Sequence, residues 1–169
     1  IGRRLFWGQS CRVTRDVLDP RPETETLVAE ALREPFLKVL DLGTGTGCIL
    51  LSCLKGMPMA RGVGTDISDA ALQVAIGNTR DLVLEARARF RKSDWFSGVT
   101  GAFDLIVSNP PYIPTEVISG LSREVREFDP ARALDGGADG LNAYRALADG
   151  AAAHLAEEGI VALEIGHDQ

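Results

Sequence analysis

Residues 41–47 read Asp41-Leu42-Gly43-Thr44-Gly45-Thr46-Gly47, a glycine-rich stretch that follows a short apolar run and opens a helical pattern. Glycines at such a turn let a ligand approach the backbone, and the N-terminus of the following helix faces that ligand. A dinucleotide fingerprint would place its third glycine one residue later, where Cys48 stands. The stretch therefore predicts a nucleotide-like ligand, although a tight strand–helix turn can also use glycine for packing alone.

Short apolar runs alternate with helical patterns from Lys38 onwards, which is typical of strand–helix units on a parallel sheet. The expected strands are Lys38–Leu42, Gly62–Asp66, Arg89–Lys92, Phe103–Ser108 and Gly159–Ile165. The expected helices are Gly47–Lys55, Asp69–Leu84 with Ser68 as its N-cap, and Leu141–Ala156. The sequence thus predicts an α/β fold with a doubly wound, mostly parallel sheet, and a ligand across the carboxyl ends of its first two strands.

The chain of 169 residues is long enough for one domain and too short for two. An N-terminal segment, residues 1–37, comprises a polar-aromatic stretch over Arg3–Leu18, a proline-rich turn and a helix over Glu23–Arg33, and the main domain is expected at 38–169. The irregular stretch at 110–140 is longer than most loops, which predicts a cover over the site. Because residue 1 is not Met and the chain stops just after a predicted strand, we expect truncation at both ends.

The composition disfavours membranes and nucleic acids. The formal net charge is −6 and the isoelectric point about 4.9, so no global field attracts phosphates. No run approaches the roughly 20 apolar residues of a membrane span. The three cysteines lack the paired spacing of a zinc site, which predicts buried free thiols, no bound metal and a cytoplasmic location.

Acidic and aromatic residues stand where a nucleoside would meet the edge of the expected sheet. Asp66 ends the second strand about twenty residues beyond the glycine stretch, where a carboxylate accepts both hydroxyls of a ribose. The position of Asp41 suits the amino group of a methionine moiety, unless this carboxylate caps the helix. Trp95 follows the third strand, where its ring can stack on adenine, unless it is a core aromatic. Together these residues predict an adenosine-containing ligand.

The fourth expected strand runs directly into Asn109-Pro110-Pro111-Tyr112. The two prolines fix the backbone and remove two amide donors, which leaves nearby carbonyl groups free to accept hydrogen bonds. The side-chain carbonyl of Asn109 and the backbone carbonyl of Pro110 can hold the two hydrogens of a planar NH2 group, and Tyr112 can stack on its plane. A rigid Pro-Pro turn without a ligand is the alternative interpretation.

An amide or aromatic amine needs such a site because its lone pair is delocalised and the nitrogen is a poor nucleophile. Acceptors on the NH2 group stabilise the positive charge that grows on nitrogen and point the lone pair at an electrophilic methyl group. The tetrapeptide beside an adenosine site therefore predicts methyl transfer from S-adenosylmethionine to a planar nitrogen, with no metal or covalent nucleophile.

The sequence resembles the HemK-type glutamine methyltransferases that modify peptide-chain release factors. The resemblance covers nearly the whole chain and is carried by these segments: Pro20–Glu25, Asp41–Gly47, Asp66–Ser68, Ser93–Phe96, Ser108–Pro114, Ala133–Gly137, Asp139–Leu141 and Glu164–Gly166. Asn-Pro-Pro-Tyr is shared with DNA adenine and other amine methyltransferases. Arg-Pro-Glu-Thr-Glu, residues 21–25, is narrower and separates this branch from the similar ribosomal-protein glutamine methyltransferases.

The resemblance implies a Rossmann-like class I methyltransferase acting in translation termination. The implied S-adenosylmethionine site comprises Asp41, Leu42, Gly43, Thr44, Gly45, Asp66, Trp95 and Asn109. The implied catalytic residues are Asn109, Pro110 and Tyr112, and together with Pro111 they bind the substrate amide. The implied substrate is the glutamine of a Gly-Gly-Gln motif in a release factor. Family members carry a small helical domain before this region and further strands after it.

Several alternatives remain open at this point. An adenine or cytosine exocyclic-amine methyltransferase of DNA or RNA shares the tetrapeptide, and a dinucleotide oxidoreductase shares the fold class. A ribosomal-protein glutamine methyltransferase and a cofactor-binding interaction module are the other two. Arg21 either positions the methionine carboxylate or the loop, or it pairs with Glu23 or Glu25, while His154 and His167 receive no role.

Overall fold

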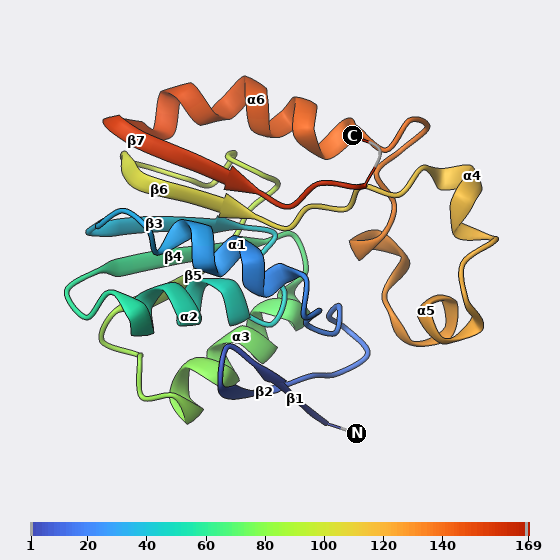
Figure 1. Ribbon diagram of the computed structural model, residues 1–169, viewed down its shortest axis with the longest axis horizontal. Helices are drawn as coiled ribbons and strands as arrows, with labels where there is room; N and C mark the ends of the chain where they lie inside the picture. The colour runs from blue at the N-terminus through green and yellow to red at the C-terminus, as the bar shows by residue number, and fades with distance from the viewer. Residues whose placement is uncertain (1, 168) are drawn as a thin grey trace.

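The computed structural model describes residues 2–167 and residue 169, which form a parallel sheet with helices on both faces (Figure 1). The sheet has the strand order β5-β4-β3-β6-β7. Its strands are β3 (Lys38–Leu42), β4 (Arg61–Asp66), β5 (Ala88–Lys92), β6 (Phe103–Ser108) and β7 (Leu155–Leu163). The chain proceeds from β3 to one edge through β4 and β5, then returns to β6 beside β3 and continues to β7. This order confirms the predicted doubly wound sheet, and its switch point lies between β3 and β6.

Alternating side chains of the strands face two apolar layers. On one face, Val39 packs with α1 (Thr24–Ala31) and α2 (Cys48–Gly56). On the other face, its neighbour Leu40 packs against Leu147 of α6 (Asn142–His154). Figure 1 shows α6 on the opposite side of the sheet from α1 and α2. Both layers leave the carboxyl ends of the strands uncovered by helices.

The helix α3 (Asp69–Asp81) begins where the sequence predicts. The hydroxyl oxygen of Ser68 accepts a hydrogen bond from the backbone amide of Ala71 at 3.2 Å, which confirms the predicted N-cap. The helix ends three residues before the predicted Leu84, because Val83 takes a φ of 56° that no helix can continue.

The stretch Arg3–Leu18 contains a hairpin that the sequence analysis does not predict. Strands β1 (Arg3–Phe6) and β2 (Gln9–Arg12) are antiparallel, and Trp7 and Gly8 form the turn with φ values of 48° and 69°. Two positive φ angles suit a two-residue hairpin turn, but such turns favour Asn-Gly and not Trp-Gly. The carboxylate of Glu25 accepts a hydrogen bond from the Trp7 amide at 2.8 Å and so stabilises this turn from a distant part of the chain.

The last strand differs from the prediction at both ends. Phe103 pairs with Leu155 and Leu105 with Ile160, so five residues of β7 lie opposite two of β6 in a bulge. Regular pairing therefore starts at Ile160, close to the predicted start at Gly159. The strand ends at Leu163, which leaves Glu164 and Ile165 beyond the sheet edge.

The predicted irregular stretch after β6 contains short helices. They are α4 (Thr115–Ile118), α5 (Arg123–Phe128) and the 3-10 helix η1 (Ala131–Ala133). Figure 1 shows α4 and α5 beyond the carboxyl ends of β6 and β7. The stretch returns to the sheet at Gly140, where a Cβ atom would lie 2.4 Å from the backbone carbonyl oxygen of Tyr112.

We expect Gly140→Ala to destabilise the protein by about 2 kcal/mol or more, because a φ of 75° and a backbone clash act together. The measurement is chemical denaturation. Gly101→Ala is the matched control, since Gly101 has a φ of 90° but a Cβ atom there would meet nothing within 4 Å. Equal losses of unfolding free energy in the two variants would mean that the clash with the Tyr112 carbonyl oxygen does not destabilise the protein.

The three cysteines, Cys11, Cys48 and Cys53, are buried and free, as predicted. Burial raises the pKa of each thiol, to about 12 for Cys53. Among the helices of residues 2–167 and 169, none is long and apolar enough to cross a membrane.

Candidate active site

A cavity of about 690 Å³ lies at the carboxyl ends of β3, β4 and β6, which is the size of a site for a small organic ligand. Its wall combines four groups predicted from the sequence: the glycine stretch, the end of β4, the turn after β5 and the tetrapeptide after β6. The predicted residues that line it are Gly43, Thr44, Gly45, Asp66, Trp95, Asn109 and Pro111. Residues 15–21, residues 130–133 and Asp135 also line it.

The glycine stretch keeps its backbone open to the cavity. Gly43 and Gly45 have φ values of 68° and 52°, and a Cβ atom at either position would meet no protein atom within 4 Å. Gly47 serves a different purpose, since a Cβ atom there would approach that of Ala75 to 3.1 Å. The first two glycines thus shape a surface for a ligand, and the third lets α2 pack on α3.

Asp66 is held at the end of β4 by two backbone amides. Its Oδ2 accepts a hydrogen bond from the Gly45 amide at 3.0 Å, and its Oδ1 accepts one from the Ser68 amide at 2.9 Å. Each carboxylate oxygen can accept a further bond. The carboxylate is therefore fixed between the glycine stretch and α3, with acceptor capacity left for hydroxyl groups in the cavity.

Asp41 and Leu42 lie beneath the glycine stretch, and neither residue lines the cavity. Asp41 is fully buried; its Oδ2 accepts the Thr44 hydroxyl at 2.6 Å, and its Oδ1 has no hydrogen-bond partner among the described residues. Burial raises the pKa of this carboxyl from 3.8 to about 7. The protein therefore keeps a carboxyl group, whose burial in the charged form costs free energy, directly under the predicted ligand site.

We expect Asp41→Asn to stabilise the protein more near pH 8 than near pH 4. The unfolded chain releases the Asp41 proton near its ordinary pKa of 3.8, whereas the folded protein keeps it up to about pH 7. Stability is thus lost as the pH rises through this window, and Asn does not titrate. One pKa unit corresponds to about 1.4 kcal/mol, so the pH-dependent gain should exceed that value. Denaturant midpoints at both pH values test this, and a gain independent of pH would contradict it.

Trp95 is placed by an unusual backbone. Its φ is 46°, and its carbonyl oxygen accepts the hydroxyl of Ser93 at 2.7 Å. The ring packs partly against the apolar layer that contains Leu42 and Leu147, and Trp95 also lines the cavity. Trp95 is therefore a partly buried aromatic at the site, and its stacking on adenine stays a prediction.

The tetrapeptide divides between the cavity and the interior. The side-chain nitrogen of Asn109 donates to the hydroxyl oxygen of Thr24 at 3.1 Å, and Asn109 and Pro111 line the cavity. Pro110 is buried and Tyr112 half-buried, and neither lines the cavity. The Tyr112 hydroxyl donates a hydrogen bond to Oε1 of Glu164 at 3.3 Å. Burial, the larger cause, and the Glu164 charge, the second, raise the pKa of Tyr112.

The Arg-Pro-Glu-Thr-Glu element contacts three separate parts of the chain through Arg21, Thr24 and Glu25. Glu25 stabilises the Trp7 turn and Thr24 holds Asn109. Arg21 forms an ion pair with Asp129 at 2.6 Å, so the expected pairing with Glu23 or Glu25 is wrong. The reason is that Asp129, only 7% exposed, lies on the long stretch that folds back over the cavity.

The pattern that defines the methyltransferase small domain matches residues 15–121, more than half of the chain. The chain belongs to this methyltransferase family. The match includes the glycine stretch, Asp66, Trp95 and the tetrapeptide, which are the groups that the fold brings to one cavity. The predicted methyltransferase family is thereby confirmed.

Relatives of this family member include two proteins named release factor glutamine methyltransferase. That of Cereibacter sphaeroides is 55% identical over 169 residues, and that of Rhodospirillum rubrum is 52% identical over 172 residues. Both matches cover 100% of this chain, but the chain spans only 61% and 53% of those proteins. The resemblance to release factor glutamine methyltransferases that the motifs predicted is thus confirmed.

Among solved structures, the chain resembles ribosomal protein L11 methylase from Lactobacillus delbrueckii subsp. bulgaricus. The TM-score is 0.56 at 24% identity, over 85% of this chain and 60% of that chain. At this identity the likeness concerns the fold alone. It agrees with the doubly wound sheet of this chain.

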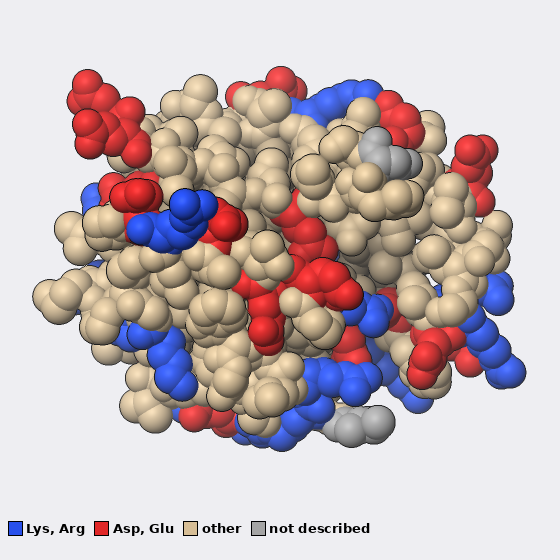
Figure 2. Space-filling view, viewed as in Figure 1, with Lys and Arg blue, Asp and Glu red and all other residues tan. Residues whose placement is uncertain are grey.

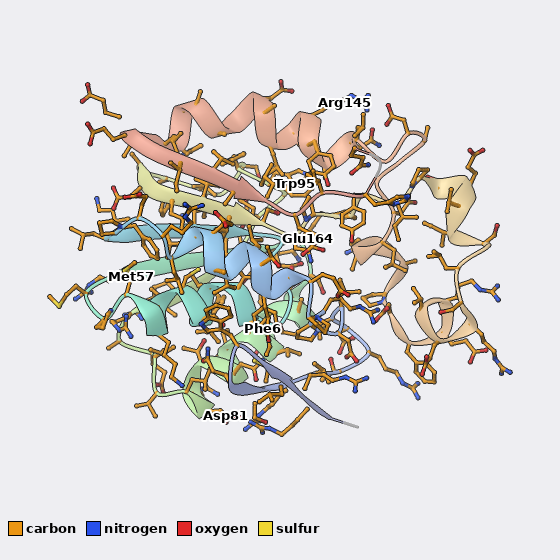
Figure 3. The ribbon with its side chains drawn as sticks, viewed as in Figure 1. Phe6, Met57, Asp81, Trp95, Arg145 and Glu164 are labelled. Carbon is orange, nitrogen blue, oxygen red and sulfur yellow. The ribbon has the colours of Figure 1, made fainter. Side chains whose placement is uncertain are left out.

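Sequence reasoning missed Thr24, Glu164 and the contribution of residues 15–20 to the cavity wall. The stretch predicted to cover the site, residues 110–140, does contribute residues 130–133 and Asp135 to this wall. Thr24 is 3% exposed although its neighbours in the sequence are polar, and no local signal predicts a partner 85 positions away. Glu164, which is labelled in Figure 3, follows the last strand. It contacts Tyr112 only because β6 and β7 are adjacent. The parallel pairing of these two strands is the one signal that predicts this contact.

Proposed function

We propose that the protein transfers a methyl group from S-adenosylmethionine to the side-chain amide nitrogen of the glutamine in the Gly-Gly-Gln motif of peptide-chain release factors. One observation carries the proposal: Asn109 lies in the same cavity wall as the glycine stretch and Asp66, and no donor among the described residues contacts its side-chain carbonyl oxygen. An acceptor for a planar NH2 group and a nucleoside site thus share one cavity. The names of the two relatives support the same substrate.

The residues present fit S-adenosylmethionine. The open side of Gly43 and Gly45 accommodates a ligand against the backbone, and Asp66 is aimed to accept two ribose hydroxyls. Trp95 offers a ring for adenine. The unpartnered Oδ1 of Asp41 suits a positive charge above it, since an ammonium group would relieve the cost of its burial.

The chain's own residues would orient the acceptor amide. When bound, S-adenosylmethionine supplies a methyl group on a positively charged sulfur. The Asn109 side-chain carbonyl and the Pro110 backbone carbonyl would accept the two N–H groups of the glutamine, which turns the nitrogen lone pair towards that methyl. The amide nitrogen would take this methyl group from the sulfur, which would keep the bonding electrons, and would lose one N–H proton to water. Both acceptors stabilise the positive charge that develops on nitrogen.

The basic residues near β5 give no support to a nucleic-acid substrate. Arg87 donates to the carbonyl oxygens of Leu54, Met57 and Ala60, and Arg91 donates to that of Gly98. Lys92 pairs with Asp69. Figure 2 shows acidic and basic side chains intermixed on the face that it presents. Flipping a base into the cavity would call for free cations on the flanking phosphates.

The test is incubation of the full-length protein with labelled S-adenosylmethionine and a release factor that carries Gly-Gly-Gln. The controls are the same release factor with Gln replaced by Ala, a ribosomal-protein substrate and unmethylated DNA. We expect label only in the unmodified release factor. Label in DNA, or equal label in both release factors, would contradict the substrate. Calorimetry that finds NAD binding without S-adenosylhomocysteine binding would contradict the cofactor.

A further inference from the structure

The amide of Asn109 has two ends of nearly identical shape and opposite chemistry. Its carbonyl oxygen accepts hydrogen bonds and its NH2 group donates them. A half-turn of the side chain exchanges the two. Only one orientation presents an acceptor to a substrate NH2 group, because the other sets two donors against each other. The site therefore requires a group that selects the orientation.

Thr24 contacts the NH2 end of this amide in the structure. Its hydroxyl oxygen receives the Asn109 side-chain nitrogen at 3.1 Å, and both residues line the cavity. With the NH2 group engaged there, the carbonyl oxygen is the end left for a ligand.

The position of the Thr24 hydroxyl is set by the protein core. Thr24 is 3% exposed at the start of α1, and Leu27, Val28 and Ala31 of this helix are buried in the layer that contains Val39. A threonine side chain is stiff because it branches at Cβ. The core thus holds the hydroxyl in place.

We propose that Thr24 is a positioning residue that holds the Asn109 amide with its carbonyl oxygen towards the substrate. This role rests on the proposed function. Thr24 acts through Asn109 and contacts neither reacting atom. The element Arg-Pro-Glu-Thr-Glu would therefore contribute to the methyl-transfer step through this one contact.

The test compares three variants of the full-length protein. Thr24→Val keeps the branched shape and loses the hydroxyl, while Thr24→Ser keeps the hydroxyl. Thr26→Val is the matched control, since Thr26 is exposed on the same helix. We expect Thr24→Val to lower kcat for glutamine methylation about tenfold, the effect of roughly one hydrogen bond. The dissociation constant of S-adenosylhomocysteine should change less than twofold, and Thr24→Ser and Thr26→Val should retain most of the activity.

A double-mutant cycle separates positioning from a purely structural effect. In the Asn109→Ala background, Thr24→Val should cost no further activity, because the residue through which it acts is gone. An unchanged kcat for Thr24→Val, a Thr24→Ser variant as impaired as Thr24→Val, or an undiminished loss in the Asn109→Ala background would overturn the proposal.

A second readout does not depend on catalysis. This chain has three asparagines, Asn78, Asn109 and Asn142, so ¹⁵N-asparagine labelling gives few side-chain amide signals. Thr24→Val should shift the Asn109 signal and speed its exchange with water, and Thr26→Val should not. If the unmodified protein transfers no methyl group to a release factor, the proposed function fails, and an unaltered Asn109 signal in Thr24→Val would overturn the positioning role separately.

Discussion

Asn109→Ala is expected to lower kcat for glutamine methylation by about 10²–10³-fold, the range found when one preorganised charge-stabilising group is removed. The dissociation constant of S-adenosylhomocysteine should change by less than about threefold. The reason is that the Asn109 carbonyl meets the reacting NH2 group, whose positive charge grows only during transfer. Single-turnover rates with a release factor, together with calorimetry of the cofactor product, measure the two quantities.

Tyr112 supplies the comparison for this result. Its hydroxyl is already engaged by Glu164 at 3.3 Å, and its side chain stands outside the cavity wall. If the ring contributes by stacking, Tyr112→Phe should be milder than Tyr112→Ala, and both should be milder than Asn109→Ala. Equal losses of rate and cofactor affinity in Asn109→Ala would make Asn109 a cofactor residue. A Tyr112→Phe variant as impaired as Tyr112→Ala would give the hydroxyl the larger role.

The sheet was most predictable where its strands contain short apolar runs. Lys38–Leu42 and Phe103–Ser108 agree with the structure at both bounds. The hairpin at Arg3–Arg12 was not predictable, since its turn places Trp7 at a positive φ that a tertiary contact from Glu25 supports. The bulge in β7 likewise depends on pairing with β6 and has no local signal.

The site was predictable to the extent that residues at strand ends meet at one edge of a parallel sheet. Asp66 is the last residue of β4, Trp95 and Asn109 follow β5 and β6, and all three line the cavity. Asp41 lies inside β3 and is fully buried beneath the turn, whereas the sequence analysis placed it among the ligand-binding residues. Its direct contact with a methionine amino group stays a prediction, as do the roles of Pro110 and Tyr112.

Asp66→Ala is expected to weaken S-adenosylhomocysteine binding by about 1.5–3 kcal/mol, the contribution of a hydrogen bond to a charged acceptor. Asp66 accepts from the amides of Gly45 and Ser68, so the variant also releases the glycine stretch from the start of α3. The two effects act in the same direction on cofactor affinity. Isothermal calorimetry measures the affinity, and thermal melting without ligand reports the loosened turn.

Asp69→Ala separates the ligand contact from the general loss of an acid at this end of α3. Asp69 pairs with Lys92, is well exposed and does not line the cavity. Removing it should leave the affinity within about twofold, because exposed ion pairs contribute little. Asp66→Asn keeps an acceptor for one amide but not the charge, so its affinity should fall between those of Asp66→Ala and the unmodified protein. If Asp66→Ala melts normally and binds S-adenosylhomocysteine with unchanged affinity, Asp66 does not belong to the ribose site. The cavity would then have to bind its nucleoside through the glycine stretch and Trp95 alone.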